Sequence, residues 1–309
     1  MDRRQFIEHV AAWSAGACLA TPLFDVRSIL AAEVKPKGTP LLAVAKGGKD
    51  YAALVTRVMK PLGGMGEFVK EGARVVVKPN IGWERTPEQA ANTHPDVVKA
   101  IVRQCLDAGA KRVLVFDRSC NDVRRSYAKS GIQAAVESIG DGRAQCVFQD
   151  QDKFVPVDIA GARSIKQFEF YRDAMAPECD CYINVPVAKH HRLSKLTLGL
   201  KNIMGILGGN RGELHKDIGR RLADVNLVVY PKLTIIDATR ILLRNGPTGG
   251  KLEDVEVLDT LVASTDTVAA DAYATTLFKM KPEEISSTVA AAEIGLGEMD
   301  LTKVKTVEA

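Results

Sequence analysis

The sequence of 309 residues lacks an apolar run long enough to span a membrane. Its most apolar stretch, Val10 to Leu23, contains Ser14 and Pro22 and falls short of the roughly 20 residues that a transmembrane helix needs. A large charge excess is also missing, because the formal net charge is only +4, too little to indicate a nucleic-acid-binding protein. We therefore expect no stable membrane span and no nucleic-acid partner.

Recognised motifs for metals, clusters and nucleotides are missing as well. The six cysteines have neither the density nor the spacing of a disulfide framework, and no C-x₂-C-x₂-C run occurs. A P-loop, a G-x-G-x-x-G turn, an H-E-x-x-H helix and a nucleophile elbow are all absent from the sequence. These absences exclude the site classes that the motifs define. We predict no metal site, and the sequence indicates no particular cofactor.

The first 32 residues have the features of a removable export signal. Arg3 and Arg4 precede a moderately apolar stretch rich in Ala and Gly, which ends in small residues near Ala32. Paired arginines select the twin-arginine route, so we expect the translocase of that route as a transient partner and a periplasmic location. Two alternatives stay open: lipidation at Cys18, and an amphipathic N-terminal helix of a cytoplasmic protein.

Behind a linker at residues 33–40, short apolar β-type runs alternate with helical patterns. Such alternation predicts a parallel sheet with crossover helices. We expect residues 41–309 to form a single α/β domain of the doubly wound type, with helices on both faces of a mainly parallel sheet and a glycine-rich helical insertion. The expected strands are 41–45, 73–77, 112–116, 144–148, 154–159, 181–185 and 233–236, and the expected helices are 50–60, 94–108, 122–139, 194–204, 214–227, 267–278 and 282–294.

Charged and amide side chains follow several of these expected strands. In open α/β sheets ligands bind beyond the carboxyl ends of the strands, where helix N-termini also present free N–H groups. A rim with several cations there suits an anionic ligand such as a carboxylate or a phosphate. The residues of this predicted rim are Lys78, Asn80, Asp117, Arg118, Lys189, His190, His191, Asp237 and Arg240.

A glycine-rich segment between residues 201 and 215 is the most unusual stretch of the chain. Its glycines can approach a phosphate closely and direct backbone N–H groups at it, whereas the alternative is a flexible lid or turn. His215, with His190 and His191, also keeps a metal site open, although adjacent residues of an extended segment point to opposite sides. The polar and glycine residues of the segment are Lys201, Asn202, Gly205, Gly208, Gly209, Arg211, Gly212 and His215.

Six short motifs together resemble a known family. They are Val76-Val-Lys-Pro-Asn80, Ala110-Lys-Arg-Val-Leu-Val-Phe-Asp117, Ile183-Asn-Val-Pro186, Leu198-Gly-Leu-Lys-Asn202, Asn245-Gly-Pro247, and Ala263-Ser-Thr-Asp266 with Asp271. This combination is similar to the bacterial and archaeal family called domain of unknown function 362, from about residue 41 to 307. The resemblance implies site residues at Lys78, Asn80, Asp117, Lys201, Asn202, Asn245, Asp266 and Asp271.

Members of that family often carry ferredoxin-type iron–sulfur cysteines, and this chain lacks the corresponding run. The resemblance therefore implies no cluster of its own but leaves a redox partner protein open. We expect a small anionic ligand to bind at the rim. An enzyme would use His190 or His191 as acid or base with Asp117 and Lys201. The alternative is a non-catalytic periplasmic binding or cofactor-handling accessory protein for an iron–sulfur redox system. The expected ligand-binding residues are Lys78, Asn80, Lys189, Asn202, Gly208, Gly209, Arg211, His215, Asn245, Asp266 and Asp271.

Overall fold

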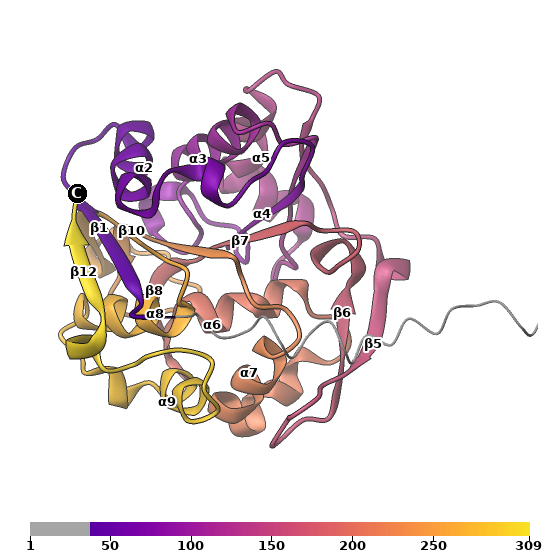
Figure 1. Ribbon diagram of the computed structural model, residues 1–309, viewed down its shortest axis with the longest axis vertical. Helices are drawn as coiled ribbons and strands as arrows, with labels where there is room; N and C mark the ends of the chain where they lie inside the picture. Colours follow the sequence, from indigo (N-terminus) through magenta and orange to yellow (C-terminus); the bar gives the residue numbers. More distant parts are fainter. Residues whose placement is uncertain (1–37) are drawn as a thin grey trace, which may run out of the picture. The chain divides into compact units, whose positions relative to one another are not determined.

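A ten-stranded mixed sheet runs through the part of the chain that the computed structural model describes, residues 38–309 (Figure 1). Its main path is, in spatial order, β12 (Lys305–Glu308), β1 (Leu41–Lys46), β11 (Val255–Ser264), β10 (Leu233–Leu242), β7 (Cys181–Val185), β2 (Arg74–Pro79), β3 (Arg112–Val115) and β4 (Ala144–Cys146). Only β11 is antiparallel to its neighbours on this path. The expected mainly parallel α/β sheet is thereby confirmed, whereas the expected export signal at residues 1–32 lies outside the described residues.

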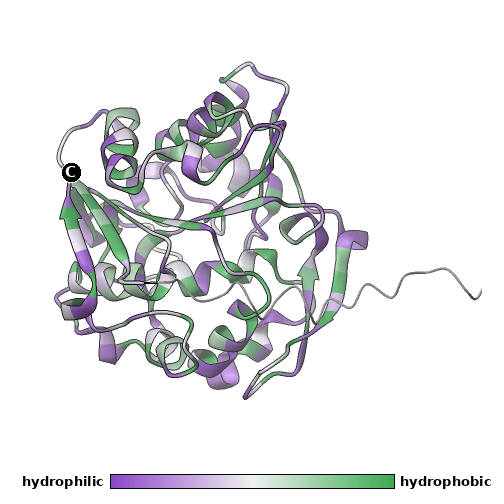
Figure 2. Cartoon of the chain, viewed as in Figure 1, coloured by the Kyte–Doolittle hydropathy of each residue, from purple (hydrophilic) through white to green (hydrophobic). Residues whose placement is uncertain are grey.

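Helices cover both faces of this sheet, because successive strand residues point to opposite sides. Val75 and Val77 of β2 belong to one apolar cluster, whereas Val76 belongs to another that includes Leu222. Figure 2 shows the strands between the two helical layers as largely hydrophobic. One face packs on α2 (Tyr51–Met59), α3 (Pro95–Asp107), α4 (Val123–Lys129) and α5 (Ile132–Glu137), and the other on α6 (Gly199–Asn202), α7 (Ile218–Asn226) and α8 (Thr267–Thr276). α9 (Ser286–Glu293) packs on these last three helices.

The strand order reverses between β2 and β7. From β2 the chain continues to β3 and β4 on one side, and then crosses to β7 on the other side of β2. β2 and β7 are parallel neighbours with Val77 opposite Ile183, so their carboxyl ends lie together. Ligands of doubly wound sheets bind at such a reversal, because the crossover connections diverge there and leave a crevice. This topology positions the site described below.

Several sequence predictions of local structure were wrong. The expected basic loop after β7 is a strand, β8 (Val187–His191), which pairs with β10 and with β9 (Lys195–Thr197). β9 also occupies part of the helix expected at 194–204, of which only α6 and a short 3-10 turn form. The helix expected at 122–139 is two helices, because Gly131 between them adopts a positive φ of 73°, which glycine tolerates and which interrupts a helix.

Two further predictions, on the neighbours of the first strand and on the place of two rim residues, were also wrong. The first two expected strands, β1 and β2, are not neighbours in the sheet, because β1 pairs with β11 and β12 instead. Asp237 and Arg240, expected beyond the end of a strand, lie inside β10. Asp237 is buried there, and its carboxylate accepts hydrogen bonds from the backbone N–H groups of His94 and Thr239. β5 (Phe154–Asp158) and β6 (Gln167–Tyr171) form a separate antiparallel pair. Of the helices within residues 38–309, none combines the length and the hydrophobicity that crossing a membrane requires.

Candidate functional site

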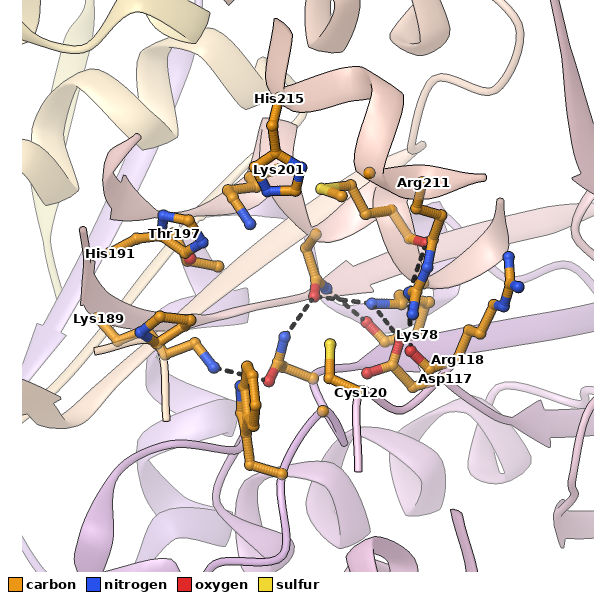
Figure 3. Close-up of a pocket in the computed structure, with 18 residues that line it drawn as sticks. Lys78, Asp117, Arg118, Cys120, Lys189, His191, Thr197, Lys201, Arg211 and His215 are labelled. Carbon is orange, nitrogen blue, oxygen red and sulfur yellow. Dashed lines mark hydrogen bonds and ion pairs between the residues drawn. The ribbon is translucent and has the colours of Figure 1, made fainter. Parts of the chain in front are cut away.

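A cavity of about 320 Å³ opens at the carboxyl ends of β2 and β3, beside β8 and α6 (Figure 3). Its volume suits a small molecule. Five cationic side chains and a single carboxylate line it, so the wall carries an excess of positive charge. The cationic residues are Lys78, Arg118, Lys189, Lys201 and Arg211, the carboxylate is Asp117, and the other polar side chains are Asn80, Cys120, His191, Thr197, Asn202 and His215.

Lys78 and Asp117 form a buried ion pair among the residues that line the cavity. The Lys78 Nζ lies 2.8 Å from Asp117 Oδ1 and donates to Asn202 Oδ1 at 2.7 Å. Burial lowers the pKa of Lys78, and the Asp117 carboxylate acts in the opposite direction. The second oxygen of Asp117 accepts a hydrogen bond from the Ile81 N–H at 2.6 Å. Each partner is thus satisfied by protein groups, and neither needs a ligand to compensate its charge.

An asparagine network connects this pair to the second lysine. Asn202 donates through Nδ2 to the Lys78 carbonyl and to Asn184 Oδ1, which fixes the direction of its side-chain oxygen. Lys189 donates to Asn80 Oδ1 at 3.0 Å and to the Ala91 carbonyl. Both acceptors are neutral. Burial, together with the charge of Lys201, lowers the pKa of Lys189 to about 7.

Lys201 differs from the other two lysines because its Nζ makes no hydrogen bond to any group of residues 38–309. The amine points into the cavity in Figure 3, and no dashed line reaches it. Burial, with the charges of Arg211 and Lys78, lowers the pKa of Lys201 to about 8. Lys201 lies on α6. The Asp271 carboxylate fixes the first turn of this helix, because it accepts hydrogen bonds from the N–H groups of Gly199 and Leu200 at 2.7 and 2.9 Å.

The two histidines of the cavity, His191 and His215, stack with ring centroids 6.1 Å apart. His191 Nδ1 accepts hydrogen bonds from the N–H groups of Leu193 and Ser194, both at 3.1 Å. An accepting Nδ1 places the proton of the neutral ring on Nε2. Burial and the nearby charge of Lys201 lower the pKa of His191 to about 3, so the ring is a neutral donor at physiological pH.

β8 decides which neighbouring side chains share the cavity. Residues two apart in a strand point to the same face, so Lys189 and His191 line the cavity and His190 does not. Thr197 of β9 is the register partner of Lys189. Its hydroxyl is buried and has no hydrogen-bond partner in the part of the chain that the structure describes. A buried unpaired hydroxyl beside a lysine is a group that a ligand can satisfy.

Gly205 allows the Lys78–Asp117 pair to exist. A Cβ built on this residue would overlap Asp117 Oδ1 and the Lys78 Cε, so any side chain here would displace the pair. Arg211 packs over the same turn and donates to the carbonyls of Arg118 and Met204 at 2.9 and 3.2 Å. The glycine-rich segment therefore closes over the ion pair, and its conformation is set by protein contacts.

The cavity brings together ten of the residues proposed from the sequence, separated by up to 137 positions: Lys78, Asn80, Asp117, Arg118, Lys189, His191, Lys201, Asn202, Arg211 and His215. The sequence did not indicate Trp83, Cys120 and Thr197, which also line it. Cys120 lies three residues after Asp117 and could have been found by extending the rule about strand ends. Trp83 and Thr197 carry no such signal, since neither lies where a recognised strand ends.

Six other proposed residues lie outside the lining, and their contacts explain why. The N–H groups of Gly208 and Gly209 bond to the Glu169 carbonyl and carboxylate, so they are not free for a phosphate. His190 Nδ1 accepts from the Gly246 N–H at 3.1 Å. Structural contacts likewise account for Asn245, which donates to Asp254, for Asp266, which caps α8 through the Ala269 N–H, and for Asp271, which holds α6.

The sequence left a metal site formed by His190, His191 and His215 as a possibility. These three side chains do not share one cavity, because His190 faces away from the cavity that holds His191 and His215. Among the described residues 38–309, no group of three or more His, Cys, Asp or Glu side chains is arranged to hold a metal ion.

Three comparisons bear on identity. The family model described as domain of unknown function 362 matches residues 75–276, a range that contains every lining residue of the cavity. A thylakoid-associated protein of Synechocystis sp. is 29% identical over 263 residues, which cover 81% of this chain and 77% of the relative. A crystal structure of a protein from Thermotoga maritima has a TM-score of 0.46 and 14% identity. That comparison covers 76% of this chain, which spans only 60% of the Thermotoga protein.

Proposed function

This chain belongs to the domain of unknown function 362 family, and we propose that its cavity binds a small anionic ligand, a carboxylate or a phosphate. The observation that carries the proposal is the charge of the lining, in which five cationic side chains meet one carboxylate. Asp117 compensates Lys78 at 2.8 Å. Lys189 and Lys201 have no carboxylate partner within the described chain.

Burying an uncompensated charge costs free energy, so proteins neutralise such a group or supply a counter-charge. The lowered pKa values of Lys189 and Lys201, about 7 and about 8, reflect this cost. An anion in the cavity supplies the missing counter-charge and raises both pKa values toward those of ordinary lysines. Binding of an anion is therefore coupled to proton uptake, and affinity falls as pH rises from about 7 to about 9 in proportion to the fraction of lysine that has lost its proton.

Isothermal titration of the full chain with phosphate and with succinate tests this proposal. We expect the tighter-binding anion to lose affinity between pH 7 and pH 9, and its heat to vary with the ionisation enthalpy of the buffer in the direction of proton uptake. Lys201→Met should weaken binding about 10- to 100-fold, since a hydrogen bond to a charged group contributes about 1.5–3 kcal/mol. Lys129→Met, at an exposed site on α4, should bind like the unaltered chain.

Stability measurements distinguish a ligand site from a structural one. Lys201→Met should leave the melting temperature of the ligand-free chain unchanged or raise it at pH 7, because it removes a charge that has no partner. A lower melting temperature together with unchanged affinity for both anions would contradict the proposal.

A catalytic version of this site is favoured by one observation. His191 presents a neutral ring with its proton on Nε2 beside the amine of Lys201, and the pKa values of both groups are lowered. Perturbed titratable groups that share a cavity are typical of sites that transfer protons. We propose that the amine of Lys201 exchanges the proton there while the neutral ring of His191 donates a hydrogen bond from Nε2 to the reacting oxygen, with Asp117 orienting Lys78.

Export by the twin-arginine route remains our proposal for the location of the protein, and it depends on Arg3 and Arg4. Replacing both with lysine should leave precursor in the cytoplasm, because the translocase recognises the arginine pair and not charge alone. Fractionation of a bacterial host and immunoblotting of both fractions measure this. Normal periplasmic accumulation of the double variant would overturn the proposal.

A further inference from the structure

The three lysines of the cavity differ in what holds their amines. Lys78 is fixed by Asp117 and Asn202, and Lys189 by Asn80 and the Ala91 carbonyl. Lys201 has no acceptor among residues 38–309, although its Nζ points into the same space (Figure 3). A lysine that only provided charge to the wall would be expected to have an acceptor, as the other two do. The free amine of Lys201 is therefore available to a ligand.

The groups around Lys201 favour the unprotonated amine. Lys78, Arg118, Lys189, Arg211 and the two histidines face the same cavity, and Asp117, the one carboxylate among the described lining residues, is already paired with Lys78. Burial acts in the same direction as these cations. Cys120 acts in the opposite direction on the pKa of Lys201, but burial outweighs it, and the resulting pKa is about 8. An appreciable fraction of the amine is thus neutral near pH 8, and a neutral amine next to other cations is a nucleophile toward carbonyl carbon.

Two further polar groups of the same cavity, Lys189 and Thr197, are suited to bind one carboxylate. Lys189 and Thr197 are register partners on β8 and β9, and both line the cavity. The Lys189 ammonium can donate a third hydrogen bond beyond its two protein acceptors. The Thr197 hydroxyl is buried and has no partner in the described chain. Together they offer two donors to a carboxylate in the cavity that also holds the Lys201 amine.

We propose that Lys201 forms an imine with the carbonyl carbon of a small 2-oxo acid, whose carboxylate is bound by Lys189 and Thr197. The inference rests on the proposed anion binding and names the class of substrate. A 2-oxo acid fits because it places an electrophilic carbon directly next to a carboxylate, and one cavity holds both the Lys201 amine and the two donors for the carboxylate.

The step balances without an oxidant or a reductant. The Nζ lone pair attacks the carbonyl carbon, a C–N bond forms, and the C=O π pair moves to the oxygen, which accepts a hydrogen bond from His191 Nε2–H. One proton then moves from the new ammonium nitrogen to this oxygen, so the carbinolamine is neutral. The hydroxyl takes a second proton from solvent and leaves as water when the C–O bond breaks, the nitrogen lone pair forms the C=N bond, and the nitrogen returns its remaining proton to solvent. One carbonyl compound and one amine yield one imine and one water.

Borohydride trapping tests the imine directly. The full chain is incubated with pyruvate or 2-oxoglutarate, treated with sodium borohydride, and analysed by intact mass and peptide mapping. We expect one equivalent of stable secondary amine at Lys201, formed faster as pH rises from 6 to 8. Lys201→Arg keeps the charge and should lose the adduct, whereas Lys129→Arg should retain it.

The outcomes separate this inference from the proposed function. If succinate or phosphate binds in titration but neither 2-oxo acid is trapped, the imine is wrong and anion binding stands. If no anion binds and nothing is trapped, both fail. Adducts at Lys78 or Lys189, or adducts spread equally over exposed lysines and retained in Lys201→Arg, would also overturn the inference. The peptide map of the unaltered chain decides the position even if Lys201→Arg fails to fold.

Discussion

Replacing Gly205 with alanine is expected to abolish anion binding and to lower the free energy of unfolding by several kcal/mol. The added Cβ would occupy the positions of Asp117 Oδ1 and the Lys78 side chain. Overpacking alone costs about 1–3 kcal/mol, and separating a buried ion pair costs about 3–5 kcal/mol. The two effects share the same displacement, so they need not add fully. Urea denaturation and titration with the anion that binds the unaltered chain measure both consequences.

A matched control is available at Gly142. A Cβ there meets no atom within 4 Å, and the residue does not require a positive φ. Gly142→Ala should therefore leave anion affinity unchanged and alter the free energy of unfolding by less than about 1 kcal/mol. Near-normal stability and affinity in Gly205→Ala would show that the Lys78–Asp117 pair can shift without loss of stability or anion binding. Our account of how Gly205 maintains this pair would then be wrong.

Asp117→Asn is expected to be the most destabilising single substitution among the polar residues of the cavity. It removes the sole carboxylate and leaves five cationic side chains without a counter-charge. Loss of one partner of a buried pair costs about 3–5 kcal/mol. Lys78→Met should cost less, because the Asp117 carboxylate that remains still faces four cations and keeps its hydrogen bond from Ile81.

The pH dependence provides the check. Burial already lowers the pKa of Lys78 in the folded protein, and losing Asp117 lowers it further. The unfolded chain then binds more protons than the folded one over the interval between the lowered pKa and the ordinary value near 10.5. Stability therefore rises with pH in that interval, so the deficit of Asp117→Asn should shrink between pH 7 and pH 9.5 in urea denaturation. An equal deficit at both pH values, or a larger one in Lys78→Met, would contradict this account.

The sequence by itself determined the α/β class, the family and a large part of the cavity wall. Alternating apolar runs predicted β2 and β3, and the rule about strand ends then selected Lys78, Asn80 and Asp117, because parallel neighbouring strands end at the same edge. The family motifs supplied Lys201 and Asn202. These inferences succeeded because they depend on contiguous residues or on patterns that a single segment carries.

Other features were decided only by the tertiary structure. β8 and β9 were missed because Lys189, His191 and Lys195 interrupt the apolar alternation of a strand, and those strands exist through pairing with β10 and with each other. The same pairing chose His191 over His190. Which lysine is compensated also depended on tertiary contacts, since the Asp117 carboxylate pairs with Lys78, whereas Lys201 has no acceptor among residues 38–309. Such pairings form between distant segments, and no local pattern in the chain contains them.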